Sequence, residues 1–169
     1  KGLEARRGDW SKLAKDAQID ALNIILREVD GKPALEKVQK IISDIRNKKV
    51  NLKDLILSNR LSKELHEYKT RGPQVAAGEL LAKTGIKVGS GTIVKYIVTK
   101  GTSKRISDRV KLPENTKIEE IDEDYYINNQ VIRATYKIRE VFGYNEEQIK
   151  NLNLVLRDWS CSIMTYCTN

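Results

Sequence analysis

The sequence predicts an α+β fold that is mainly α-helical and contains one small antiparallel β element. Long stretches carry apolar residues at helical spacing, and they flank a single glycine-bounded stretch rich in β-branched residues. The 169 residues are enough for one domain with a real core, and 32% charged and 40% hydrophobic residues are ordinary for a globular protein. No apolar run has the length of a membrane span, and no secretory signal is present.

Two helices are expected at the start of the chain, over 10–29 and 34–46. Apolar residues recur at helical spacing through both ranges, and Asp9 is a candidate N-cap for the first. The connecting sequence DGKP ends the first helix at Gly31 and puts Pro33 near the first turn of the second. A turn this short predicts that the two helices pack antiparallel.

The middle of the chain is expected to hold short elements and then a further helix. The segment 52–57, LKDLIL, is compatible with a strand or a helix, and 61–68 has helical character. A helix is expected over 73–84, because Pro73 suits a first turn and Gly85 suits a helix end.

The β element is expected from Gly89 onward. The stretch GSGTIVKYIVTKG is bounded by glycines and rich in β-branched residues, which predicts a strand, and ISDRVKLP can pair back as a second one. A helix then returns over 122–142. Gly143 is expected to end it, and Asn145 to cap another.

The net charge of +8 is concentrated in residues 80–112, which we call the basic segment. It contains eight basic residues and one acid, Asp108, whereas residues 113–169 contain more acids than bases. A local excess of this kind favours a polyanion as partner over a small charged ligand. An ordinary solvated basic surface is the alternative.

Residue types that carry out catalysis are sparse. The only histidine is His66, and the two cysteines are Cys161 and Cys167, so neither a multi-ligand His/Cys metal site nor a Ser-His-Asp set is expected. The cysteine usage fits a reducing, intracellular setting. The acidic run IEEIDEDYY is more typical of a helix start than of a two-metal site, and KVGSGT lacks the ending of a P-loop. The sequence therefore predicts no active site in this chain.

Three places combine cations with glycine corners, as a surface that grips nucleic-acid phosphates would. GLEARRGDW puts Arg6 and Arg7 just before a helix start, and EYKTRGPQ puts Lys69 and Arg71 beside Gly72 and another helix start. A glycine-turned hairpin tip, KGTSKRISDRV, carries Lys100, Lys104, Arg105, Ser107 and Arg109. Together these places predict backbone contacts to a duplex, although each one alone is also compatible with a surface turn.

Four segments, in this order, resemble the C-terminal part of archaeal and eukaryotic family B DNA polymerases: KGLEARRGDW, LSKELHEYKTRGPQVAAGELLAKTGIKVGSGTIVKYIV, ISDRV and DEDYYINNQVIRATYKIREVFGY. The resemblance implies that residues 1–10 form the end of the palm at the palm–thumb junction. It further implies that residues 11–150 form a helical thumb domain with a small antiparallel β element, and 151–169 a C-terminal tail. In this family the thumb holds the minor-groove side of the primer–template duplex behind the active site.

The resemblance also implies which residues contact DNA. Arg7 corresponds to an arginine that approaches the primer strand in the family, and Arg6 stands beside it. The sequence YKTRGPQV matches a family motif whose turn meets the DNA backbone, and ISDR matches an element near the duplex. The predicted DNA-binding residues are Arg6, Arg7, Arg60, Tyr68, Lys69, Arg71, Gly72, Pro73, Gln74, Ser107 and Arg109.

Three positions depart from the family's pattern. Gln74 replaces the usual histidine, which removes a possible cation but keeps a hydrogen-bond donor. Gly8 occupies the position of a second arginine. Arg133 replaces a common proline, which predicts a straighter helix there.

The function implied by the resemblance is a duplex-clamping part of a DNA-directed DNA polymerase, a nucleotidyltransferase. The family's Mg-binding motifs are missing from this sequence, so no catalytic residue and no metal ligand is predicted in it. Mg²⁺ is expected in the catalytic part of the polymerase, and this chain alone is expected to be inactive.

The expected partners are primer–template duplex DNA and the catalytic exonuclease and palm portion, on another chain or on a missing segment. A sliding clamp is a further candidate partner, through Ile163 and Tyr166 of the tail. A cytoplasmic, nucleoid-associated location without a membrane is expected if the protein is archaeal. The alternative function is a stand-alone basic module that binds structured RNA or a protein partner.

Overall fold

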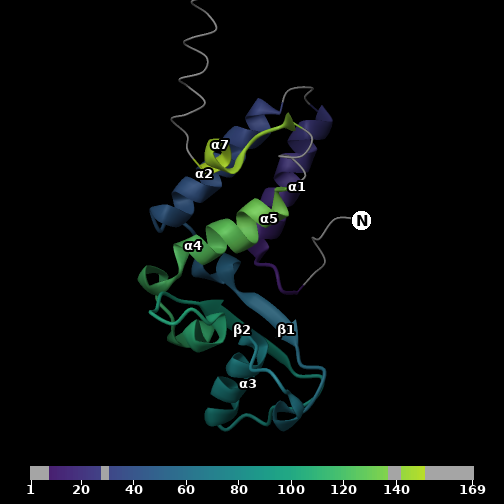
Figure 1. Cartoon of the computed structure of the whole chain (residues 1–169), viewed down its shortest axis with the longest axis vertical. Helices are drawn as coiled ribbons and strands as arrows, with labels where there is room; N and C mark the ends of the chain where they lie inside the picture. Colours follow the sequence, from purple (N-terminus) through teal and green to yellow (C-terminus); the bar gives the residue numbers. More distant parts are fainter. Residues whose placement is uncertain (1–7, 28–30, 137–141, 151–169) are drawn as a thin grey trace, which may run out of the picture.

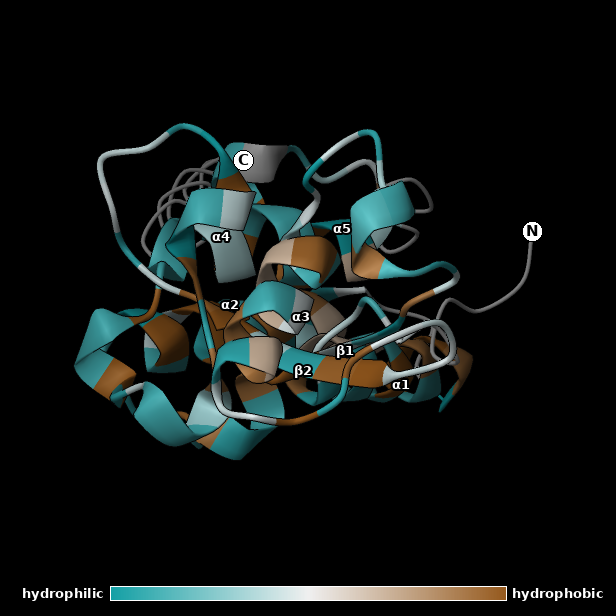
Figure 2. Ribbon diagram, turned by 90° about the horizontal axis from the view of Figure 1, so that it is seen from below, coloured by the Kyte–Doolittle hydropathy of each residue, from teal (hydrophilic) through white to brown (hydrophobic). Residues whose placement is uncertain are grey.

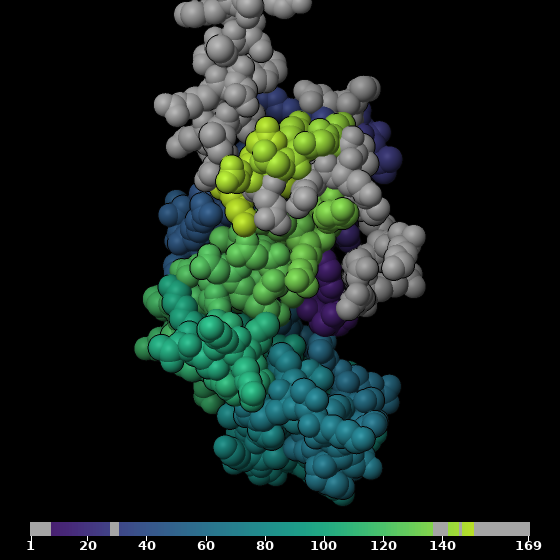
Figure 3. Space-filling model, viewed as in Figure 1, coloured from purple at the N-terminus to yellow at the C-terminus, as the bar shows by residue number. Residues whose placement is uncertain are grey.

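A computed structural model describes residues 8–27, 31–136 and 142–150 of the chain. Helices α1, α2, α5 and α7 gather toward one end of the elongated molecule, and the sheet and α3 lie toward the other (Figure 1). In the space-filling view, residues of the sheet and α3 (blue to teal) form this second end (Figure 3). The fold is α+β and mainly helical with one small antiparallel sheet, as the sequence predicts. No helix in the described part of the chain is long and apolar enough to cross a membrane.

The first two helices, α1 (Lys12–Arg27) and α2 (Lys32–Arg46), form the predicted antiparallel pair (Figure 1). Their contact excludes solvent, since Ala17 and Ala21 of α1 are fully buried in one cluster with Ile42 of α2. The apolar spacing of both helices is thus explained by one shared core.

The predicted N-cap of the first helix, Asp9, is wrong by two residues. Ser11 caps α1, since its Oγ accepts a hydrogen bond from the backbone N–H of Ala14 at 3.3 Å. The reason is tertiary: the side chain of Gln130 accepts a hydrogen bond from the N–H of Ser11 at 2.8 Å and donates one to the carbonyl of Asp9 at 3.2 Å. These two bonds hold residues 9–11 in a turn, so the helix starts after it.

A three-stranded antiparallel sheet has the order β1-β2-β3. Strand β1 (Leu57–Arg60) pairs with β2 (Ile93–Val98), and β2 pairs with β3 (Val110–Lys111). The strand predicted after Gly89 and its return strand are therefore confirmed. The segment that was compatible with either element is divided between a 3-10 helix (Leu52–Leu55) and the start of β1.

The helix predicted over 61–68 is wrong, because only a 3-10 turn (Leu65–Glu67) forms there. Leu61 continues the sheet: its N–H donates to the carbonyl of Thr92 at 2.8 Å, and its carbonyl accepts from the N–H of Gly91 at 2.7 Å. The next backbone amide is also bonded, since the N–H of Ser62 donates a hydrogen bond to the hydroxyl of Tyr68 at 2.8 Å. Strand pairing and this tyrosine override the local helical pattern.

Helix α3 (Pro73–Lys83) has the predicted start, and Gly85 follows it with the positive φ of 87° that favours glycine. The helix buries Val75, Ala76 and Ala77. Seen from the α3 end, hydrophobic residues (brown) make up much of strand β2 beside this helix (Figure 2). The small side chains of α3 let it lie close to the sheet.

The helix predicted from residue 122 consists of α4 (Glu123–Tyr125), a π-helical segment (Tyr126–Val131) and α5 (Ile132–Ala134). The periodicity did not indicate the π-helical segment, and residues 137–141 of the predicted helix lie outside the described residues. After it, Gly143 has a φ of 70°, and Asn145 caps α7 (Glu146–Lys150) as predicted. The cap is reciprocal, with bonds of 2.8 and 2.9 Å between Asn145 and Gln148.

Candidate nucleic-acid interface

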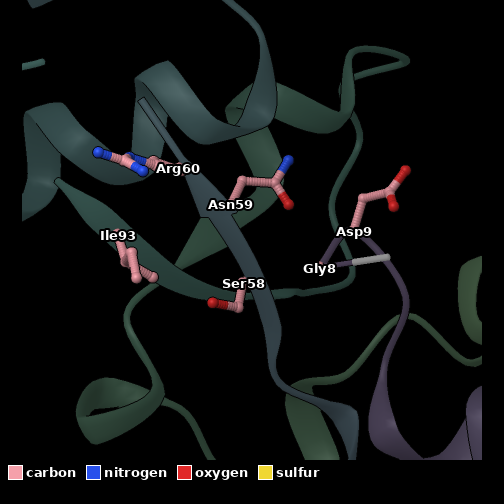
Figure 4. A pocket seen from close by; sticks show the side chains of 6 residues that line it. All are labelled: Gly8, Asp9, Ser58, Asn59, Arg60 and Ile93. Carbon is pink, nitrogen blue, oxygen red and sulfur yellow. The ribbon is translucent and has the colours of Figure 1, made fainter. Parts of the chain in front are cut away.

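A hollow of about 450 Å³ lies beside strand β1 (Figure 4). Asn59 and Asp9 stand on one side of the β1 ribbon in this view, and Ser58 points to the other side. A second hollow, of about 420 Å³, continues beyond Arg60 to the turn at Ser90 and Gly91. The two hollows share Arg60, and together they form what we call the β1 groove. Its lining residues are Gly8, Asp9, Ser58, Asn59, Arg60, Leu61, Ser62, Ser90, Gly91 and Ile93.

One face of the β1–β2 pair carries two cations, of which Arg60 lines this groove. Arg60 lies opposite Ile93 in the register, and Ser58 lies opposite Lys95, so these four side chains share a face of the sheet. Arg60 and Lys95 are exposed, and neither forms an ion pair within the described residues. Ile93 is 60% exposed between them. The arrangement can hold an anion against a flat, partly apolar surface.

Glycines let the chain run close to β1 at both ends of the groove. The carbonyl of Gly8 accepts a hydrogen bond from the N–H of Ser58 at 3.0 Å, and a Cβ on Gly8 would collide with the Ser58 carbonyl oxygen. Gly91 has a φ of 86°, and a Cβ there would lie 3.3 Å from Arg60 Nη2. In the groove itself, Asn59 Oδ1 is buried without a hydrogen-bond partner in the described part of the chain. A ligand donor is one way to satisfy it.

The predicted Gly-Pro corner brings Lys69, Gly72, Pro73 and Gln74 together at the start of α3. Lys69 is exposed and makes no ion pair with any described residue. Gln74 folds its amide over Gly72, where a Cβ would lie 2.8 Å from Gln74 Oε1. Lys69 is thus the free cation of this corner.

Arg71, the other cation of the corner, is already paired. Its guanidinium donates to Glu79 and to Asp108, at 2.9 Å in each case. These bonds tie the segment before α3 to the 3-10 helix Ile106–Arg109. The prediction that Arg71 contacts DNA stays a prediction, and such a contact competes with two carboxylates.

Ser107 and Arg109, predicted as DNA contacts, lie inward. Ser107 is buried, and the Arg109 side chain is only 17% exposed and paired with Asp122. Arg109 Nε is buried without a partner in the described residues. Asp122 also caps α4, because its Oδ1 accepts from the N–H of Tyr125 at 2.9 Å. The pair therefore joins the end of the 3-10 helix Ile106–Arg109 to the start of α4, and the DNA contacts of Ser107 and Arg109 stay predictions.

The acidic run before α4 neutralises part of the basic segment. Lys111 pairs with Glu120 at 2.6 Å, and Lys100 pairs with Glu123 at 2.9 Å. The hydrogen bond from Lys111 holds the pKa of Glu120 below its usual value. The cations of the basic segment that are exposed and make no ion pair within the described residues are Lys83, Lys87, Lys95, Lys104 and Arg105. The charge count of this segment therefore overstates its free charge.

A lysine outside the basic segment joins the same acidic run. Lys48, just after α2, pairs with Glu123, which Lys100 also contacts. Burial lowers the pKa of Lys48, and the neighbouring charge of Lys100 lowers it further. One carboxylate thus links the helical part of the molecule to the connection after β2.

Tyr68, another predicted DNA contact, has its hydroxyl occupied by the turn that it closes. The hydrogen bond with the Ser62 hydroxyl, at 3.2 Å, and those from the backbone N–H groups of Ser62 and Lys63 lower the pKa of this phenol. Its direct role is to fix the turn beside the β1 groove.

Sequence reasoning found Arg60 but missed the groove around it. The predicted contacts Arg6 and Arg7 lie outside the described residues, as does the tail segment with Ile163 and Tyr166. The alternation in IVKYIV could have put Ile93 and Lys95 on one face. The described residues contain no group of three or more His, Cys, Asp or Glu side chains that could hold a metal ion.

Comparisons with known proteins agree on one family. The model of "DNA polymerase family B" matches residues 1–141. The DNA polymerase of Thermococcus aggregans is 44% identical over 152 residues, which are 89% of this chain and 8% of that protein. The DNA polymerase of Methanocaldococcus jannaschii is 41% identical over 150 residues, which are 89% of this chain and 9% of that protein.

A solved structure, that of the family B DNA polymerase from the hyperthermophilic archaeon Pyrobaculum calidifontis, aligns with a TM-score of 0.71 at 38% identity. The alignment covers 82% of this chain and 19% of that one, so the chain spans only a small part of the relatives it matches. The resemblance seen in the sequence is confirmed, and the chain belongs to DNA polymerase family B.

Proposed function

We propose that this chain is the duplex-clamping thumb part of a family B DNA-directed DNA polymerase, holding primer–template DNA by its backbone during DNA synthesis. The observation that carries the proposal is the β1 groove, in which the free guanidinium of Arg60 separates two hollows and Lys95 shares its sheet face. Family membership supports it, because the matched relatives bear the name DNA polymerase.

The mechanism is attraction of phosphates without reading of bases. Arg60, Lys95 and Lys69 are exposed and make no ion pair within the described residues, so they can neutralise phosphates and release counterions. Gly8 and Gly91 let the chain pass close to Ser58 and Arg60 at the two ends of the groove. Contacts of this kind position a duplex without specifying its sequence, which suits a part that must accept every product.

Nucleotide incorporation would require the rest of the polymerase. The metal would be held by the catalytic portion, since the family's Mg-binding motifs are missing from this sequence. Docking of the tail on a sliding clamp and a cytoplasmic, nucleoid-associated location belong to the same proposal.

The test is duplex binding as a function of salt. We expect binding that is independent of sequence and weakens steeply with salt, with a slope of about −0.9 per phosphate neutralised. Arg60→Ala should reduce the magnitude of that slope by about 1, since it removes one phosphate contact.

The matched control is Lys40→Ala, which removes an exposed cation of α2 that makes no ion pair in the described residues. It should leave the slope unchanged. Binding that is insensitive to salt, or that requires one particular RNA hairpin, would instead support the alternative of a stand-alone module.

A further inference from the structure

A third hollow, of about 330 Å³, adjoins the β1 groove through Asp9, which lines both. Three of its eight lining residues are aromatic, and polar side chains reach it from the π-helical segment and from α5. The lining residues are Asp9, Trp10, Tyr96, Ile106, Tyr125, Asn129, Gln130 and Arg133. We call it the aromatic pocket. A concave pocket in which aromatic side chains and convergent polar groups meet is a common form of binding site.

The Tyr96 hydroxyl is one polar group of this pocket that has no hydrogen bond in the described part of the chain. Tyr96 is 4% exposed and lines the pocket, yet no described residue makes a hydrogen bond with its hydroxyl. The neighbouring Tyr126 shows the ordinary situation, because its buried hydroxyl accepts a bond from the N–H of Val98 at 3.2 Å. Burial raises the pKa of both the Tyr96 and Tyr125 phenols, so both remain protonated donors at neutral pH.

The pocket is held in shape by its surroundings. Gln130 bonds the backbone of both Asp9 and Ser11 across the base of the pocket, at 3.2 and 2.8 Å. It lies in the π-helical segment, a distortion that is frequent at functional sites. The side chains of Asn129 and Arg133 make no hydrogen bond or ion pair within the described residues. The pocket thus keeps donors and acceptors available.

The charges of the pocket favour a neutral ring over a phosphate. The lining includes one carboxylate, Asp9, and one guanidinium, Arg133, so it has no excess of positive charge. Trp10 and Tyr125 offer aromatic surface of the kind on which bases stack. Tyr96 and Asn129 can both donate and accept, as the edge of a nucleobase requires. Because the pocket shares Asp9 with a groove that holds phosphates in the proposed function, the base of a nucleotide is the ligand in reach.

We infer that the aromatic pocket receives a single unpaired nucleobase at the end of a DNA strand whose backbone lies in the β1 groove. The base stacks against the aromatic walls, and the Tyr96 hydroxyl bonds its edge. This inference rests on the proposed function, since it assumes that the backbone of the DNA strand lies in the β1 groove. Its role is to capture a terminal nucleotide that has left the double helix.

The experiment compares two hairpin duplexes, identical except that a single 3′-overhanging nucleotide carries thymine in one and is abasic in the other. Their dissociation constants for the full 169-residue chain are measured by fluorescence anisotropy. We expect the thymine overhang to bind about fivefold tighter or more, as one stacked base contributes. Tyr96→Phe keeps the ring and should lower that ratio about threefold, and Arg133→Ala, at an exposed position, should also lower it.

Tyr126→Phe is the matched control, because it removes a hydroxyl that is bonded inside the core, and it should keep the full ratio. Equal affinity for the two hairpins overturns the inference. So does a preference for thymine that Tyr96→Phe and Arg133→Ala leave intact, because the base then binds elsewhere. Salt-dependent binding of a blunt duplex would still support the clamp in either case, so the two proposals fail separately.

Discussion

Two cationic regions of the molecule use their charges in opposite ways. On the β1–β2 face, Arg60 and Lys95 are exposed and make no ion pair with described residues. In and around β3, Arg109 and Lys111 are paired with carboxylates that precede or begin α4. The comparison teaches that a cation is available to bind a ligand only if no carboxylate of the same chain already neutralises it. Charge density along the sequence cannot distinguish these two cases.

The largest expected effect is on stability, from Arg109→Met. The substitution leaves Asp122 buried without its counter-charge, and breaking one side of such a pair costs about 3 kcal/mol. Urea unfolding measures it. The control is Lys111→Met, whose partner Glu120 is more exposed, and it should cost less than about 1 kcal/mol. Equal small losses in both variants would mean that the buried pair does not join the two ends of the molecule.

The next effect is on DNA binding, from Arg60→Glu combined with Lys95→Glu. Two reversed charges on the open sheet face should weaken duplex binding roughly tenfold or more at low salt. The melting temperature should stay unchanged, because neither side chain makes an ion pair within the described residues. Lys15→Glu combined with Lys40→Glu reverses as much charge on α1 and α2. If that pair of substitutions weakens binding equally, only net charge matters and the groove has no special role.

A smaller effect separates the two cations of the Gly-Pro corner. Lys69→Ala should weaken duplex binding about threefold without changing stability. Arg71→Ala should instead cost roughly 0.5 to 1 kcal/mol of unfolding free energy, because it breaks two exposed ion pairs. Anisotropy and urea unfolding give the two quantities. A loss of affinity in Arg71→Ala alone would reverse the assignment of the free and the structural cation.

The smallest effect concerns pH. The folded pKa of Glu120 lies below its usual value, chiefly because of the hydrogen bond from Lys111. Its contribution to stability is therefore fully present above the unfolded pKa and is lost as the pH falls through the folded one. NMR titration of the wild type should show the lowered value, and Lys111→Met should raise it toward normal. An unchanged Glu120 pKa in that variant would mean that the hydrogen bond from Lys111 is not what lowers it.

The sequence predicted the regular parts of the fold well, for physical reasons that are local. The two first helices, α3 and strand β2 follow from apolar spacing and from Gly and Pro at their ends. The start of α1 at Ser11 and the 3-10 turn at Leu65 could not be predicted in this way, because distant groups decide them. Gln130 bonds the turn before α1, and strand pairing holds Leu61.

The candidate site could be predicted less completely from the sequence than the fold. Arg60 and Lys69 were named and are free in the described part of the chain, whereas Ser107 and Arg109 were named and lie inward. Pairing with Asp122 across 13 positions has no periodic signature in the sequence. The β1 groove likewise depends on how residue 8 meets β1, which is a tertiary contact.

The most direct measurement is an amide chemical-shift map of the ¹⁵N-labelled chain titrated with a blunt DNA duplex. If the β1 groove holds the DNA backbone, the largest shifts will fall on Gly8, Ser58, Arg60, Gly91 and Lys95. Shifts concentrated on α1 and α2, with these five amides unmoved, would contradict the account.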